Sequence, residues 1–185
     1  MEWALLGILV LAVLWMVVVY NRLVALRAEA DQAWADVDVQ LRQRHDLIPN
    51  LVETVKGAAG HERGTLEAVV QARNAAVAAR GPEAQAAAEN ALSASLGRLF
   101  ALSEAYPSLQ ANQNFRDLQG QLQGVEDRLA AARRFFNNAV AEFNAAIQQV
   151  PAVFIAGRLG FRARPFFELS GEERARMAEP PAVRF

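Results

Sequence analysis

The feature that most constrains the fold is an apolar run near the N-terminus. Residues 3–20 read WALLGILVLAVLWMVVVY and contain no charged side chain. As a helix this run is roughly 27 Å long, which is near the lower limit for crossing the hydrocarbon core of a bilayer. Aromatic rings lie towards both of its ends, as in helices whose rings rest at the two membrane interfaces. The run predicts a transmembrane anchor over residues 1–21, with these anchor residues: Trp3, Leu14, Trp15 and Tyr20.

The flanks of this apolar run favour a retained anchor over a cleaved signal peptide. A signal peptide opens with positive charge and closes with a small-residue cleavage site, but here Glu2 precedes the run and Asn21 follows it. Arg22 and Arg27 lie on the C-terminal side, whereas the N-terminal side carries no lysine or arginine. The positive-inside rule therefore predicts a single-pass protein of the cell membrane, with its N-terminus outside and the rest of the chain cytoplasmic.

Beyond the anchor, apolar residues recur at gaps of three and four, which is the spacing of long packed helices. Two long stretches with this spacing cover residues 23–58 and 115–150, and two shorter ones lie at 66–77 and 88–106. Asn114 is expected to cap the second long helix. Few segments alternate with a period of two, so no sheet is expected. The predicted fold is all-α: the N-terminal transmembrane helix continues into a long antiparallel helical bundle of four helices, two long and two short.

Composition divides the chain into four expected parts. They are a transmembrane anchor (1–21), a helical-bundle domain (22–150), an aromatic and arginine-rich membrane-proximal segment (151–169) and a loose C-terminal tail (170–185). The two long helices extend beyond the two short ones, so part of the bundle would contain only two helices. Two helices cannot cover their own apolar stripes well, and we therefore expect a homo-oligomer.

The stretch QRHDLIPNLVETVKG places a proline inside the first long helix. Pro49 removes one backbone hydrogen bond and leaves the carbonyl of His45 without its usual partner, which a nearby polar side chain or water must replace. Because the apolar spacing resumes in phase beyond Pro49, we predict a helix kink at His45 and Pro49. A complete break over residues 46–49 and an active site are the alternatives.

Aromatic and arginine residues are interleaved in the segment that follows the second long helix. Such a segment suits a membrane surface, since rings enter the acyl boundary while guanidinium groups meet lipid phosphates. The candidate membrane-surface residues are Phe154, Arg158, Phe161, Arg162, Arg164, Phe166 and Phe167. The alternative is that these phenylalanines fold back on the bundle as ordinary core.

The sequence contains no convincing catalytic constellation. Asp36 and Asp38 point roughly 200° apart on a helix, so they cannot share one metal ion. His61 and Glu62 begin like the zinc-protease motif HExxH, but Thr65 stands where its second histidine is required. The chain has two histidines, no cysteine and, as far as the apolar spacing indicates, no acid on an apolar stripe. We therefore expect no enzyme, no catalytic residue, no metal and no cofactor. The formal net charge of -1 also gives no field that would attract nucleic acid.

Five segments, in this order along the chain, resemble the bacterial LemA family. They are YNRLVALRAEADQAW, QRHDLIPNLVETVKG, ENALSASLGRLFALSEAYPSL, RRFFNNAVAEFNAAIQ and GFRARPFFEL. The resemblance implies one N-terminal membrane helix, a small extracellular N-terminus and a helical-bundle body. A magnetosome protein looks like a relative, which links the family to membrane remodelling or organisation, and the family keeps company with membrane zinc metalloproteases. The resemblance carries over no catalytic or ligand-binding residue.

The expected function is that of a non-enzymatic, membrane-anchored helical scaffold. It would self-associate and organise or remodel membrane or membrane proteins. Its expected partners are the lipid bilayer, further copies of itself and another membrane protein, with no nucleic acid. The alternative is an adaptor subunit of another membrane complex, such as a membrane metalloprotease.

Overall fold

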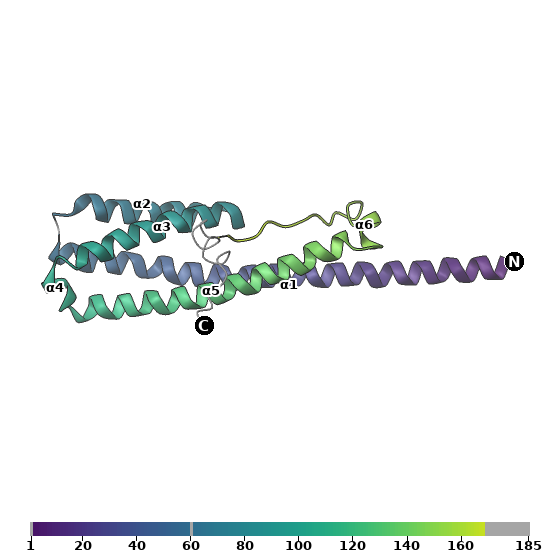
Figure 1. Cartoon of the computed structure of the whole chain (residues 1–185), viewed down its shortest axis with the longest axis horizontal. Coiled ribbons are helices and arrows are strands. Elements are labelled where there is room, and N and C mark those ends of the chain that lie inside the picture. The colour runs from purple at the N-terminus through teal and green to yellow at the C-terminus, as the bar shows by residue number, and fades with distance from the viewer. Residues whose placement is uncertain (1, 60, 169–185) are drawn as a thin grey trace, which may run out of the picture. The chain divides into compact units, whose positions relative to one another are not determined.

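The computed structural model describes residues 2–59 and 61–168, and these residues are helical throughout most of their length (Figure 1). Within them there is no strand, so the all-α prediction is confirmed. The predicted tail at 170–185 lies outside the described residues. The helices are α1 (Glu2–Ala58), α2 (Arg63–Ala78), α3 (Pro82–Ser103), α4 (Pro107–Gln110), α5 (Gln113–Gln148) and α6 (Ala152–Ile155). The apolar run therefore continues without interruption into the first long helix, as predicted.

Local sequence explains where these helices begin and end. Pro82 occupies the first turn of α3, where a missing N–H costs nothing, and Gly81 before it adopts a φ of 81° that suits glycine. The prediction that Asn114 caps α5 is wrong. Instead, Oδ1 of Asn112 accepts hydrogen bonds from the backbone N–H groups of Asn114 and Phe115, at 2.9 and 3.4 Å. The cap lies two residues earlier because α5 already begins at Gln113.

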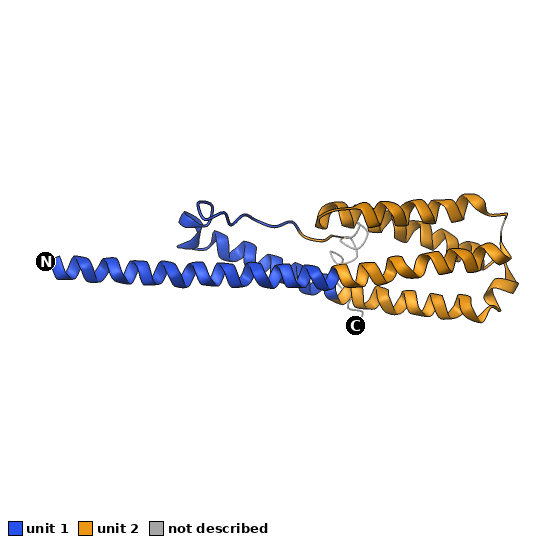
Figure 2. Cartoon of the chain, turned by 180° about the vertical axis from the view of Figure 1, so that it is seen from behind, with its two compact units in different colours: residues 1–37, 132–165 blue, residues 38–131, 166–185 orange. Residues whose placement is uncertain are grey.

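The described chain divides into two compact units (Figure 2). Unit 1 comprises Met1–Val37 and Ala132–Pro165, and unit 2 comprises Asp38–Ala131 with, of the described residues, 166–168. Helices α1 and α5 each contribute one part to both units. The domain boundaries drawn from composition remain predictions.

Unit 1 pairs the first part of α1 with the last part of α5 in antiparallel orientation. The ring of Trp34 packs on Phe136 with centroids 5.1 Å apart, and the earlier Leu23 of α1 shares a buried cluster with the later Phe143 and Ile147 of α5. Residue numbers thus rise along one helix as they fall along the other. Residues 2–18 of α1 are exposed.

Unit 2 is a four-helix bundle made from α1, α2, α3 and α5, with α4 at one corner (Figures 1 and 2). Short connections make consecutive helices antiparallel neighbours. Each helix contributes its apolar stripe to one buried cluster, and burying it is the main favourable term in folding this unit. Members of that cluster are Ile48, Leu51, Val55, Leu66, Val69, Leu92, Leu96, Leu99, Leu109, Phe115 and Leu122.

Candidate membrane-interaction site

Helix α1 contains one stretch that is long and apolar enough, by length and composition, to cross a membrane, and none of that stretch is buried. Three of the predicted anchor side chains, Trp3, Leu14 and Trp15, are 86 %, 58 % and 52 % exposed, and Tyr20 is exposed too. Contiguous apolar surface on this scale is unfavourable in water and marks a site that another apolar phase covers. A bilayer supplies that phase.

The segment that follows α5 docks beside the C-terminal end of the apolar run. The Phe161 ring meets the Tyr20 ring edge to face, with centroids 5.7 Å apart, and lies 6.4 Å from the Phe143 ring. Phe161 is buried in the cluster that contains Leu23, and Val19 packs against the same cluster. The fold therefore brings this segment next to the point where the predicted membrane span ends.

Hydrogen bonds to one asparagine side chain fix this segment to α5. Nδ2 of Asn144 donates to the carbonyl of Arg164 at 2.9 Å, and the backbone N–H of Arg164 donates to Oδ1 of Asn144 at 2.8 Å. The Arg164 guanidinium also reaches α1, where it lies 2.6 Å from Asp31 and donates to the carbonyl of Arg27 at 3.4 Å. Sequence reasoning did not assign this role to Asn144, because a polar residue on a helix does not reveal which distant backbone it will bind.

The seven candidate membrane-surface residues separate into two groups. Phe161 and Phe167 are buried, as in the alternative in which these rings fold back as core, and Arg164 is half-buried and paired with Asp31. The exposed group consists of Phe154, Arg158, Arg162 and Phe166. Lipid contact remains a prediction for the exposed group.

Helix α6 buries one face and exposes another. Ala152 and Ala156, one turn apart, are buried in the cluster with Leu23. Phe154 in α6 is 70 % exposed, and Val150, two residues before α6, is 76 % exposed. Val153 and Leu159 are exposed as well. This apolar surface belongs to the same segment as Phe161, which touches Tyr20.

In unit 2 the most notable electrostatic feature is a fully buried carboxylate, Glu89 of α3. Its Oε2 accepts a hydrogen bond from Nη1 of Arg44 at 2.7 Å, and its Oε1 lies 2.7 Å from Nε2 of His45 and 2.9 Å from Nε2 of Gln85. Burial by itself raises the pKa of Glu89. The hydrogen bond with His45 and the charge of Arg44 outweigh that effect and hold the pKa below its ordinary value.

The expectation that no apolar stripe carries an acid is therefore wrong. Glu89 lies on the buried stripe of α3, three residues before Leu92, and faces the two polar residues that interrupt the stripe of α1. Arg44 also donates to Oγ of Ser93 at 2.7 Å and lies 3.3 Å from Glu126 of α5. The sequence did contain a signal for this cluster. Polar residues interrupt two apolar stripes, at Arg44 and His45 in α1 and at Glu89 in α3.

This polar cluster has the chemistry of a structural ion pair. Both carboxylate oxygens of Glu89 are occupied by protein donors, which leaves no oxygen directed at a ligand. Across residues 2–59 and 61–168, no three His, Cys, Asp or Glu side chains come together in a way that could hold a metal ion.

Helix α1 runs through Pro49 without a break, so the alternative of a complete break over residues 46–49 is wrong. The carbonyl of His45, which the proline deprives of its helical partner, accepts a hydrogen bond from Nε of Arg73 in α2 at 3.3 Å. A polar side chain thus replaces the lost donor, as the sequence predicted. The kink itself remains a prediction.

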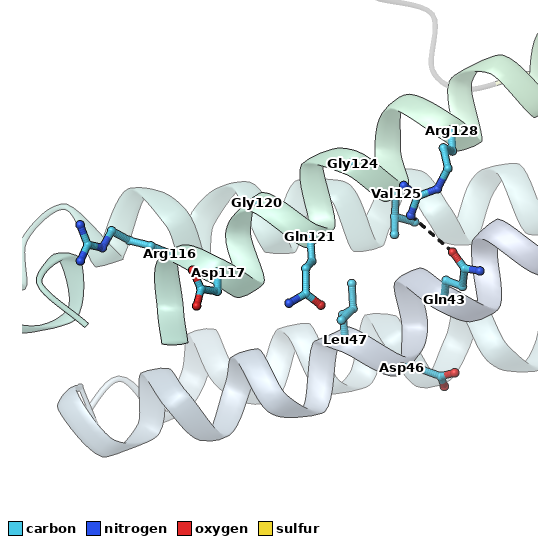
Figure 3. Close-up of a pocket in the computed structure, with 10 residues that line it drawn as sticks. All are labelled: Gln43, Asp46, Leu47, Arg116, Asp117, Gly120, Gln121, Gly124, Val125 and Arg128. Atoms are coloured by element: carbon cyan, nitrogen blue, oxygen red, sulfur yellow. Dashed lines mark hydrogen bonds between the residues drawn. The ribbon is translucent and has the colours of Figure 1, made fainter. Parts of the chain in front are cut away.

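A cavity of about 780 Å³ lies between α1 and α5 in unit 2 (Figure 3). Arg128 crosses it by donating to the side chains of Gln40 at 3.1 Å and Gln43 at 3.5 Å. Two glycines of α5, Gly120 and Gly124, form part of its wall. The lining contains two aspartates, Asp46 and Asp117, and no serine, threonine, cysteine or histidine.

Comparison with known proteins finds magnetosome proteins among the relatives of this chain. Magnetosome protein MamQ of Magnetospirillum gryphiswaldense is 26 % identical over 174 residues, which are 80 % of this chain and 64 % of that protein. Magnetosome protein MamQ 2 of Paramagnetospirillum magneticum is 24 % identical over 175 residues, with the same coverage of both chains. The chain thus spans a little under two thirds of the length of these relatives.

The model of the LemA family matches residues 33–185, which include both parts of unit 2 and all of the C-terminal part of unit 1. The apolar run precedes the matched region. Because the match covers far more than half of the chain, the protein belongs to the LemA family.

Proposed function

We propose that the protein is a non-enzymatic scaffold anchored in the bacterial cell membrane. In this proposal residues 3–20 span the bilayer, the N-terminus is outside, and the helical units lie in the cytoplasm and organise membrane or membrane proteins. The observation that carries the proposal is the apolar run, of which no part is buried, together with the docked segment whose Phe161 packs on Tyr20. Both place apolar surface at one end of unit 1.

The chemistry of the described residues supports a non-catalytic role. The buried carboxylate of Glu89 is paired with Arg44 and His45, and the lining of the cavity between α1 and α5 contains no serine, threonine, cysteine or histidine. The description of the family and the names of the relatives also assign no reaction. Long helices that present exposed side chains along their length suit a protein that acts by binding.

Self-association is supported by the apolar side chains that the two helices of unit 1 leave uncovered. Phe135 of α5 is 51 % exposed and Val24 of α1 is 41 % exposed. Contact with a second copy of the chain would cover such side chains, and burial contributes about 25 cal/mol for each Å² of apolar surface removed from water. These exposed side chains are the proposed contact between copies.

The test is the oligomeric state of the full-length protein in membranes, measured by chemical crosslinking and by mass determination in lipid nanodiscs. We expect the unchanged protein to form oligomers and Phe135→Arg to shift it towards monomers. Val39→Arg is the matched control, because Val39 is 49 % exposed but lies in unit 2. A protein that is monomeric in native membranes would overturn the self-association part of the proposal.

A role as an adaptor subunit is the second candidate, and one observation favours it. Val70 and Val77, two turns apart on α2, are 41 % and 45 % exposed and form a short apolar stripe on the outside of unit 2. A partner protein could bind there. Affinity purification from native membranes separates the two roles. A scaffold recovers mainly itself, whereas an adaptor recovers one client in constant ratio and loses it when both valines are changed to serine.

A further inference from the structure

Unit 1 contains a pocket of about 290 Å³ whose positive charge the fold does not neutralise. It is bounded by α1, by Phe143 of α5 and by residues 160–165 of the docked segment. Its charged lining consists of Arg27, Arg162 and Arg164 against Asp31. Three positive charges and one negative charge leave a net charge of +2 in this pocket.

The single aspartate is already engaged. Asp31 lies 2.6 Å from the guanidinium of Arg164, whose backbone is in turn fixed by Asn144. The side chains of Arg27 and Arg162 are exposed, and within residues 2–59 and 61–168 they make no hydrogen bond or ion pair. Arg164 therefore holds the segment in place, while Arg27 and Arg162 remain available for a ligand.

The pocket lies close to the end of the predicted membrane span. Gly160 and Arg162, which line it, are the chain neighbours of Phe161, and the Phe161 ring is 5.7 Å from Tyr20 at the end of the apolar run. On α1, Arg27 follows Tyr20 by seven residues, or about 10 Å of helix. The headgroup layer adds roughly 5–8 Å to each side of the hydrocarbon core, and long arginine side chains readily extend towards it.

We propose that this pocket binds the phosphate of an anionic phospholipid headgroup in the leaflet next to the docked segment. The inference rests on the proposed membrane span of residues 3–20. Arg27 and Arg162 donate hydrogen bonds from their planar guanidinium groups to the phosphate oxygens, which is the geometry arginine is suited to. A zwitterionic headgroup offers the same phosphate but adds a cation, which the net charge of +2 disfavours. The pocket is therefore selective for anionic lipid.

The experiment uses the full-length protein in detergent micelles, titrated with phosphatidylglycerol or with phosphatidylcholine of the same acyl chains. Bound lipid is counted by native mass spectrometry. The test variant is Arg27→Gln with Arg162→Gln, and the matched control is Arg63→Gln with Arg98→Gln, which removes two exposed arginines from unit 2. Circular dichroism checks that both variants retain the helical content of the unchanged protein.

We expect the unchanged protein and the control to retain phosphatidylglycerol in preference to phosphatidylcholine. The test variant should bind phosphatidylglycerol about 30-fold more weakly, which corresponds to about 1 kcal/mol for each arginine. Equal retention of the two lipids by the unchanged protein would overturn the inference, as would undiminished phosphatidylglycerol binding by the test variant. Displacement of the lipid by millimolar glycerol phosphate would show a site for soluble phosphate and would also overturn it.

Carbonate extraction of native membranes separates a failure of this inference from a failure of the proposed function. If the unchanged protein stays in the membrane but shows no lipid preference, only the headgroup site is wrong. If carbonate releases the protein, the membrane span is wrong, and the headgroup site fails with it because it depends on that span.

Discussion

At the scale of single residues, Glu89 and Arg44 form a buried ion pair. Its net contribution to the free energy of unfolding depends on both partners being present. Removing one partner of such a pair leaves the other charge buried without compensation, which typically costs about 3–5 kcal/mol. Glu89→Gln keeps the shape of the side chain but removes its charge. We expect it to lower the free energy of unfolding by about 3 kcal/mol, since Glu126 still lies 3.3 Å from Arg44. Urea unfolding followed by circular dichroism measures this loss, and Glu67→Gln on the exposed side of α2 is the control.

The same carboxylate makes stability depend on pH in a defined direction. The pKa of Glu89 is lower in the folded protein than its ordinary value of 4.5. Its contribution is therefore fully present above about pH 4.5 and is lost as the pH falls through the folded pKa. The stability gap between the unchanged protein and Glu89→Gln should shrink as the pH falls below about 4.5. A gap that is as wide at pH 3 as at pH 7 would show that the charge of Glu89 is not its source.

The polar residues of this cluster also show how far sequence reasoning reaches at this scale. The sequence indicates that Arg44 and His45 interrupt an apolar stripe and that the carbonyl of His45 needs a new donor. It does not identify the partners, because Arg73 is 28 residues away and Glu89 is 44 residues away. Only the packing of α2 and α3 against α1 brings these groups within hydrogen-bonding distance.

At the scale of helices, the Arg73 side chain acts as a substitute for the amide that Pro49 lacks. Arg73→Met should lower the free energy of unfolding by about 1 kcal/mol, the typical net value of one hydrogen bond. In a Pro49→Ala background the restored N–H of residue 49 can donate to the carbonyl of His45, so the same Arg73 substitution should cost close to nothing. A double-mutant cycle by urea unfolding measures this coupling. An equal loss in both backgrounds would mean that Arg73 stabilises the bundle in another way.

Gly120 and Gly81 differ in how well each position would tolerate a side chain. A Cβ added to Gly120 of α5 meets no atom within 4 Å, whereas Gly81 before α3 has a φ of +81° that strains any other residue. Gly120→Ala should therefore raise the free energy of unfolding by about 0.5–1 kcal/mol, because alanine restricts the unfolded chain more and prefers a helix. Gly81→Ala should lower it by about 1 kcal/mol. Urea midpoints give both values, and a destabilising Gly120→Ala would contradict the open surroundings of that residue.

The helices themselves were predictable to different degrees. Repeated gaps of three and four located α1, α2, α3 and α5, because each buries one continuous stripe in a shared core. The spacing could not indicate α6, which is only a four-residue helix and is held by the burial of Ala152 and Ala156 against residues far earlier in the chain. It also could not show which of the tail phenylalanines become core. Phe161 is buried because it meets Tyr20 and Phe143, and Phe154 has no such partners within the described chain.

At the scale of the whole molecule, the proposed topology follows from the charge difference across the apolar run. Residues 21–27 carry two arginines, whereas Glu2 lies on the other side of the run. Positively charged flanks are retained in the cytoplasm, so the side of the run that carries Glu2 should face outwards. If the orientation were reversed, the arginine pocket of unit 1 would lie next to the outer leaflet instead. The pocket would then bind lipids of the outer leaflet.

The absence of cysteine makes this topology directly measurable, since any introduced thiol is the only one in the chain. We expect Glu2→Cys to react with a membrane-impermeant maleimide on intact cells, where the outer membrane has been made permeable if there is one. Arg98→Cys, at an exposed position of α3, should react only after the inner membrane is opened. Labelling of Arg98→Cys on intact cells would show that the orientation is the reverse of the proposed one. Equal labelling of both variants in the soluble fraction would show that residues 3–20 do not span a membrane. The proposed scaffold would then have no anchor in the bilayer.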